Sequence, residues 1–195
     1  MARILFIGDS ILEGMAPHVY RILDDGRHGS GEARIDARSG WSTRRWLNEG
    51  ELRAIVAAFR PSTAVVALGT NDEGEEANPT SYAERVVRLR DQAAELGAQV
   101  IWVTGFSGSG LERRLRIVQG ALGARATIDG AGLMPGVSMS GEIHPSEAGY
   151  RVLSFRFVTA VFDRIGSEKP RASSPVVPVL LGAGLAAAAL AAWRL

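Results

Sequence analysis

The chain has 195 residues, of which 46% are hydrophobic and 22% charged, and its formal net charge is +1. This length is sufficient for one domain with a buried core, and the composition is typical of a globular protein rather than a disordered one. The small net charge excludes a strong argument for nucleic acid as a partner, because such binding usually needs a clustered basic excess. The absence of cysteine excludes disulfides, a cysteine nucleophile and thiolate metal ligands.

Short apolar segments alternate with segments of helical periodicity along the body of the chain. The pattern predicts strands over residues 2–8, 32–38, 62–69, 98–105 and 124–129. It predicts helices over residues 10–25, 42–60 (as one helix or two short ones), 79–97, 111–123 and 144–166. This alternation favours a parallel sheet with helices on both faces, in which ligands bind beyond the carboxyl ends of the strands.

The C-terminal part of the chain has a different composition. Residues 167–175 are typical of a polar linker, and residues 176–195 form an apolar tail in which Val176–Trp193 contains no charged residue. We expect a domain over residues 1–166 and a transmembrane anchor in the tail, with the domain on the cytoplasmic side and no signal peptide. The alternative is a terminal helix that packs on the domain or on another subunit, and the sequence does not indicate the oligomeric state.

Residues suited to acyl transfer follow the ends of three expected strands. Ser10, Gly40 and Asn71 stand at these ends, and His144 immediately precedes the last helix. A serine becomes a nucleophile when a base takes its proton, and histidine is the usual base. Backbone N–H groups and amide side chains can stabilise the developing oxyanion. Each feature alone is explained by a helix cap or a turn, but their joint occurrence favours a catalytic site.

These residues belong to four short sequence blocks. The blocks are GDS at Gly8–Ser10, the glycine at Gly40, GTND at Gly69–Asp72 and HPS at His144–Ser146. Together they resemble the blocks of the SGNH (GDSL-type) hydrolase family, from about Ile4 to Ile165. The resemblance implies a five-stranded parallel sheet of flavodoxin-like type in three α/β/α layers, to which the apolar tail would add a C-terminal helix. It also implies an esterase, lipase, thioesterase, deacetylase or acyltransferase.

The resemblance implies a role for each matching residue. Ser10 would be the nucleophile and His144 the general base. The N–H groups of Ser10 and Gly40 and the side chain of Asn71 would be the oxyanion donors. The other members of the blocks that are expected to support the site are Asp9, Gly69 and Asp72.

Position 141 departs from the family pattern. The family usually has an aspartate three residues before the histidine, where its carboxylate orients the imidazole, and this chain has Gly141 there. Glu142 is the nearest replacement, a backbone carbonyl is another, and Asp129 is a more remote one. The sequence leaves three states open: a triad completed by Glu142, a Ser–His dyad of reduced activity, and a degenerate site.

We therefore expect a metal-independent serine esterase that acts on a small or medium acyl ester or an O-acetyl group of a glycan or lipid, with no cofactor. Acyl transfer to a hydroxyl other than water, and a catalytically degenerate scaffold or assembly protein tethered to a membrane, are the alternatives. Trp41 and Trp46 are expected to line a pocket or to pack in the core. The basic sequences at 38–46 and 111–116 fit solvated helix faces, and His18 and His28 fit surface or packing positions.

Overall fold

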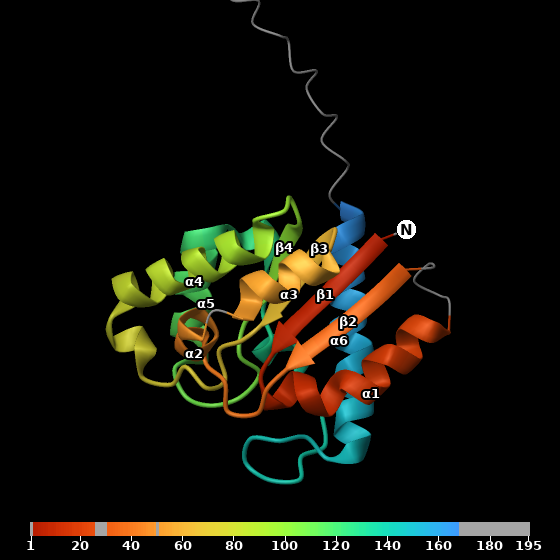
Figure 1. Ribbon diagram of the computed structural model, residues 1–195. Helices are drawn as coiled ribbons and strands as arrows, with labels where there is room; N and C mark the ends of the chain where they lie inside the picture. The colour runs from red at the N-terminus through yellow and green to blue at the C-terminus, as the bar shows by residue number, and fades with distance from the viewer. Residues whose placement is uncertain (1, 26–30, 50, 168–195) are drawn as a thin grey trace, which may run out of the picture.

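Five parallel strands in the order β2-β1-β3-β4-β5 form the centre of the molecule (Figure 1). They are β1 (Ala2–Gly8), β2 (Gly31–Ala37), β3 (Thr63–Ala67), β4 (Gln99–Val103) and β5 (Thr127–Ile128). The computed structural model describes residues 2–25, 31–49 and 51–167. The strand order confirms the flavodoxin-like parallel sheet expected from the sequence.

Helices cover both faces of the sheet and make the fold three-layered (Figure 1). They are α1 (Ser10–Asp24), α2 (Thr43–Asn48), α3 (Glu51–Phe59), α4 (Pro79–Ala94), α5 (Leu111–Leu122) and α6 (Glu147–Ser167), with short 3-10 turns η1 (Glu75–Ala77), η2 (Ala124–Ala126) and η3 (Ala131–Leu133). Helices α1 and α6 pack on one face, and α2 to α5 pack on the other.

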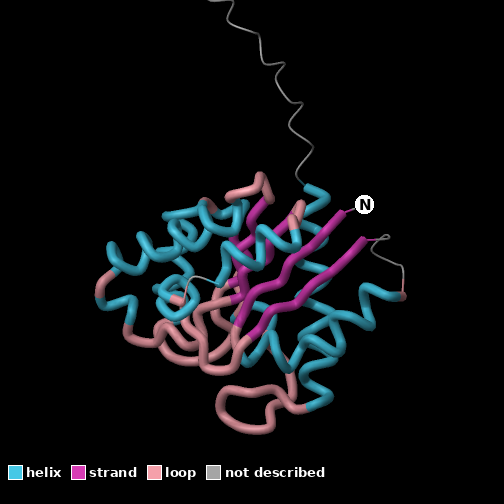
Figure 2. The backbone as a smooth tube through the Cα atoms, viewed as in Figure 1, coloured by secondary structure: helices cyan, strands magenta, loops and turns pink. Residues whose placement is uncertain are grey.

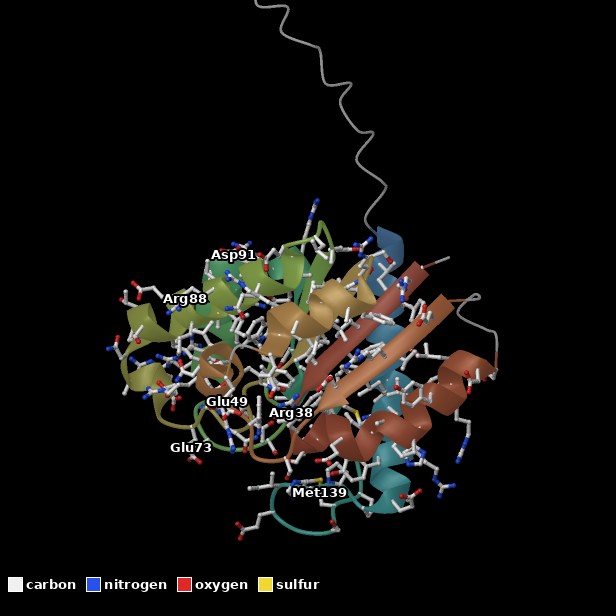
Figure 3. All side chains as sticks on the ribbon, in the orientation of Figure 1. Arg38, Glu49, Glu73, Arg88, Asp91 and Met139 are labelled. Carbon is white, nitrogen blue, oxygen red and sulfur yellow. The ribbon has the colours of Figure 1, made fainter. Side chains whose placement is uncertain are left out.

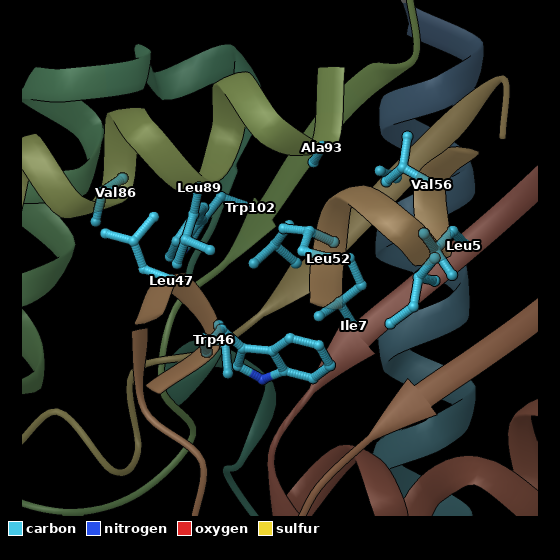
Figure 4. Close-up of a cluster of buried hydrophobic side chains, with 14 of the residues drawn as sticks. Leu5, Ile7, Trp46, Leu47, Leu52, Val56, Val86, Leu89, Ala93 and Trp102 are labelled. Carbon is cyan, nitrogen blue, oxygen red and sulfur yellow. The ribbon is translucent and has the colours of Figure 1, made fainter. Parts of the chain in front are cut away.

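The two apolar cores follow from the alternation of side chains along the strands. In β1, Leu5 and Ile7 point to the face covered by α2 to α5, whereas Ile4 and Phe6 point to the face covered by α1 and α6. Figure 4 shows the first of these cores, in which the indole of Trp46 lies against β1. Burial on both faces explains the continuous apolar character of the central strands in the sequence.

The structure changes the expected bounds of three segments. The segment 42–60 forms the two helices α2 and α3, the second of the two alternatives. The strand expected over 124–129 was predicted too long: it is reduced to Thr127–Ile128, because Gly123 takes a left-handed φ of 87° and starts the 3-10 turn η2. The helix expected over 144–166 begins at Glu147, because Ser146 caps it: its hydroxyl accepts the N–H of Gly149 at 3.1 Å.

No helix in the described part of the chain is long and apolar enough to cross a membrane. The linker after Ser167 and the apolar tail expected to form a C-terminal helix or a membrane anchor lie outside the described residues. Their assignment stays a prediction.

The loops that follow the strands gather at one edge of the sheet, as Figure 2 shows in pink at the carboxyl ends of the magenta strands. Two of these loops touch through glycines. A Cβ on Gly69, which has a φ of 133°, would lie 2.6 Å from the backbone nitrogen of Gly105. A Cβ on Gly105 would lie 2.6 Å from the backbone of Gly69 and Thr70. The loops after β3 and β4 therefore approach each other more closely than any side chain allows.

This approach gives a paired prediction. We expect Gly105→Ala to lower the free energy of unfolding by about 1–3 kcal/mol, because backbone atoms must shift to admit the methyl group. The matched control is Gly120→Ala in the exposed part of α5, where a Cβ meets nothing within 4 Å. This control should raise stability by about 0.5–1 kcal/mol, the difference in helix propensity. Urea unfolding of both variants measures the difference, and equal stabilities would contradict the close contact.

Candidate active site

Ser10 is the first residue of α1, directly after the end of β1. A Cβ on Gly8 would lie 2.6 Å from the side chain of Leu12, so the absence of a side chain lets the helix start this close to the strand. Asp9 is the N-cap, and its carboxylate accepts the N–H of Ile11 at 3.0 Å. This turn holds the half-buried Ser10 at the carboxyl edge of the sheet.

His144 faces Ser10 from the loop that precedes α6. Its Nε2 lies 3.0 Å from Ser10 Oγ, a distance at which the hydroxyl can donate to a neutral imidazole. Two contacts hold the loop: the N–H of Ser140 donates to the His144 carbonyl at 3.0 Å, and the hydroxyl of Ser107 donates to the Ile143 carbonyl at 3.2 Å. The backbone therefore fixes where the imidazole stands.

The three residues expected to provide oxyanion donors follow the carboxyl ends of β1, β2 and β3. Gly40 has a φ of 71°, in the left-handed region, and its N–H, like that of Ser10, donates to no described residue. The Asn71 Nδ2 donates to the Trp41 carbonyl at 3.2 Å. This bond uses one of the two amide hydrogens and fixes the orientation of the amide, so the other hydrogen remains for a ligand.

Hydrogen bonds join the strand-end loops around these donors. Asp72 is fully buried, and its Oδ1 accepts both the N–H and the hydroxyl of Thr43 at 3.0 Å. The Gly8 carbonyl accepts the N–H of Arg38 at 3.1 Å and the indole N–H of Trp46 at 3.2 Å. The loops after β1, β2 and β3 thus form one connected structure. Figure 3 shows the side chains at this edge, where Arg38, Glu73 and Met139 are labelled.

Two buried carboxyl groups lie in this structure, and burial raises the pKa of both. For Asp9 burial raises the pKa to about 7, and the charge of Asp72 adds to the rise while the N–H groups of Ile11 and Leu12 oppose it. For Asp72 burial also raises the pKa, against the hydrogen bonds from Thr43 and the positive charge of Arg114. Ser10 therefore stands beside a carboxyl group that titrates near neutral pH.

The structure does not connect the candidate third members of the site to His144. Glu142 is exposed, and within the described residues it forms no hydrogen bond or ion pair. Asp129 is also exposed and lies beside Gly132. Among residues 2–25, 31–49 and 51–167, the His144 side chain has Ser10 as its hydrogen-bond partner, and Glu142 remains a prediction.

Other side chains singled out in the sequence have packing roles. Trp46 is fully buried and Trp41 nearly so, which favours packing over a pocket wall. His18 is buried with its Nε2 3.3 Å from Glu147 Oε1, and His28 lies outside the described residues.

One interpretation of the basic sequences was wrong. Arg114 in the sequence 111–116 is not on a solvated face, because its side chain is 1% exposed. Its partners Asp72 and Glu76 lie 42 and 38 residues away in sequence, so no local pattern could have identified these contacts. Within the described residues, no group of three potential ligands could hold a metal ion.

Comparisons with known proteins agree with this fold. A family model described as "Protein of unknown function (DUF459)" matches residues 3–107. Comparison with curated proteins gives no match.

Solved esterases and lipases share the fold at low identity. The lipase/acylhydrolase from Enterococcus faecalis is 20% identical, with a TM-score of 0.66 over 84% of this chain and 97% of that chain. The psychrotrophic esterase EstA from Pseudoalteromonas sp., inhibited by monoethylphosphonate, is 11% identical, with a TM-score of 0.67 over 85% and 100% of the two chains. The acetyl xylan esterase Axe2 from Geobacillus stearothermophilus is 20% identical, with a TM-score of 0.63 over 87% and 97%. These matches confirm the SGNH hydrolase fold.

The raised pKa of Asp9 predicts how stability depends on pH. Because the folded pKa of about 7 lies above the ordinary value of 3.8, the folded protein binds the proton more tightly. This contribution to stability is fully present below about pH 4 and is lost as the pH rises through about 7. Asp9→Asn keeps the acceptor for Ile11 and stays uncharged, so we expect it to gain about 3 kcal/mol relative to wild type between pH 4.5 and pH 8.

Urea unfolding at the two pH values measures this gain. The control is Glu13→Gln, an exposed carboxylate in the first turn of the same helix, for which no such pH dependence is expected. A constant difference between Asp9→Asn and wild type at both pH values would contradict the burial of a titrating carboxyl group.

Proposed function

The chain belongs to the DUF459 family and has the SGNH hydrolase fold, and from this premise we propose that it is a serine esterase with Ser10 as nucleophile and His144 as general base. The single observation that carries the proposal is the 3.0 Å separation of Ser10 Oγ and His144 Nε2. The proposal also rests on two N–H groups and one amide side chain at the same edge of the sheet.

The first half of the reaction forms an acyl-enzyme. Ser10 Oγ attacks the ester carbonyl carbon while His144 Nε2 takes the hydroxyl proton. The negative charge that develops on the carbonyl oxygen is stabilised by the N–H groups of Ser10 and Gly40 and by Asn71 Nδ2. His144 then gives the proton to the departing alcohol oxygen as the carbon–oxygen bond breaks.

The second half of the reaction releases the acid. A water molecule gives a proton to His144 Nε2 and attacks the acyl carbon, and the same donors stabilise the second oxyanion. The proton returns to Ser10 Oγ as the acyl bond breaks. In this scheme His144 works as the base of a dyad, because no carboxylate in the described structure contacts its imidazole.

The substrate class is proposed from the openness of the site. Gly40, Asn71 and His144 are all exposed. A hollow of about 710 Å³ lies between α4 and α5 and is lined by none of the site residues. We therefore propose a small or medium acyl ester, or an O-acetyl group, as the substrate.

The test of the nucleophile is hydrolysis of p-nitrophenyl acetate and butyrate by the full chain. Ser10→Ala should lower kcat/KM by about 10³-fold or more, because the nucleophile is lost. A fluorophosphonate should label Ser10 in the folded protein, with denatured protein as the control. Equal inactivity of wild type and Ser10→Ala, together with an unlabelled Ser10, would favour the scaffold alternative over catalysis.

The test of the dyad uses the empty position before the histidine. A Cβ on Gly141 meets nothing within 4 Å, so a side chain can be introduced there. Since a carboxylate that orients the imidazole is worth about 10⁴ in turnover in a serine protease, we expect Gly141→Asp to raise kcat by about 10-fold or more.

Two variants control for this effect. Gly141→Asn has nearly the same shape without the charge and should leave kcat within about twofold of wild type. Glu142→Ala should also have little effect in a dyad, whereas a large loss of kcat would identify Glu142 as the third member of a triad.

A further inference from the structure

The segment that carries Asn71 has little regular structure of its own. It runs from the end of β3 to η1. The Leu68 N–H donates to the Val103 carbonyl at 3.1 Å, but beyond Leu68 the backbone hydrogen bonds are those of turns: the Asp72 N–H donates to the Gly69 carbonyl at 3.3 Å and the Glu75 N–H to the Asp72 carbonyl at 3.1 Å. An oxyanion donor must be held in place before the reaction to be effective. Contacts from outside the segment must therefore hold Asn71 in place.

The side chain of Arg114, in α5, extends to this segment. Its guanidinium donates through Nη1 to the Asp72 carbonyl at 3.3 Å and to Glu76 Oε2 at 2.7 Å. Through Nη2 it donates to the Ser109 carbonyl at 2.6 Å. Glu73 accepts the hydroxyl of Ser109, which adds a second link between the same two loops. The Arg114 side chain is thus bonded to Asp72 and Glu76, at the two ends of the segment after Asn71. It is also bonded to the loop before α5.

The carboxylate of Asp72 connects this segment to the loop that contains Gly40. It accepts the N–H and the hydroxyl of Thr43, three residues after Gly40. The carbonyl of Trp41, in the same loop, accepts the Asn71 amide. A shift of Asp72 would therefore change the position of Asn71 relative to Gly40.

We propose that Arg114 is a positioning residue for the oxyanion site: it holds the Asn71–Glu76 segment against the loop from Gly40 to Thr43, so that both donors face the same point. This inference rests on the proposed function for its catalytic consequence. The contacts that hold the segment are independent of that function.

The energetics favour positioning over stability as the role of this side chain. Arg114 is 1% exposed and Glu76 14%, and a buried ion pair gains little net stability because both charges lose their water. The Nε of Arg114 is buried without a hydrogen-bond partner among the described residues, which adds a cost. A planar guanidinium can reach three acceptors in a fixed geometry, which a lysine ammonium cannot reproduce.

The first experiment is a double-mutant cycle on the full chain with p-nitrophenyl acetate. Arg114→Met should lower kcat by about 10–100-fold with KM within about twofold, because a misplaced donor weakens transition-state stabilisation. In the Asn71→Ala background the same substitution should lower kcat by less than about threefold, since the donor it positions is already missing. Arg114→Lys should give an intermediate kcat. The control is Arg116→Met, which removes an exposed arginine of the same helix that pairs with Glu112.

The second experiment measures hydrogen exchange and does not depend on activity. The amides of Thr43, Asp72 and Glu75 should exchange at least about 10-fold faster in Arg114→Met than in wild type or Arg116→Met. Unchanged exchange would overturn the proposal, and so would additive kcat losses in the cycle when wild type is active. An inactive wild type with unlabelled Ser10 would instead overturn the esterase function, and the exchange rates alone would then decide whether Arg114 holds the segment.

Discussion

The close backbone approach at Gly8 is the constraint on which the rest of the site depends. A side chain there would meet Leu12 at 2.6 Å and the Ala67 carbonyl at 2.9 Å, so α1 can begin at the very end of β1 only because the side chain is absent. The Gly8 carbonyl also accepts the N–H of Arg38 and the indole of Trp46. Because β1 pairs with β2 on one side and β3 on the other, this turn has no freedom to move alone. Ser10 is therefore attached to the most firmly held part of the sheet.

Buried polar side chains extend this rigidity along the carboxyl edge. Asp9, Thr70, Asp72 and Arg114 are all nearly inaccessible to solvent, in a protein whose cores are otherwise apolar. Burying such groups costs free energy unless each finds a partner with good geometry, so few arrangements of the loops satisfy all of them together. The network therefore selects one loop arrangement more than it stabilises the fold. Rigidity of this kind is what a group of oxyanion donors requires, because reorganisation during the reaction would reduce their effect.

The sequence contained most of the fold but only part of the site. Continuous apolar runs gave β1 to the residue and located β3 and β4, because strands buried on both faces need such runs; the last two were each predicted one residue too long at the start and two at the end. The fifth strand was predicted too long, since the 3-10 turn that follows Gly123 occupies the first half of the expected segment. Ser10 and His144 could be paired because motif residues at strand ends must share one edge. Arg114 could not be found, since its charge predicts exposure and its partner Glu76 is 38 residues away. Long-range burial of a charge leaves no periodic signal.

With glycine at position 141, the backbone of the loop and Ser10 orient His144 in the described structure, rather than a carboxylate side chain. In a triad, the carboxylate fixes both the tautomer and the rotation of the imidazole. Here the loop is fixed by Ser140 and Ser107, and the ring itself is held by its contact with Ser10. One hydrogen bond leaves the ring freer to rotate than a triad does, so in the proposed mechanism a smaller fraction of molecules would have Nε2 ready to accept the proton. Within the described residues, no carboxylate forms an ion pair with the His144 ring. With a base held by one contact at an exposed site, the proposed esterase is expected to be slow.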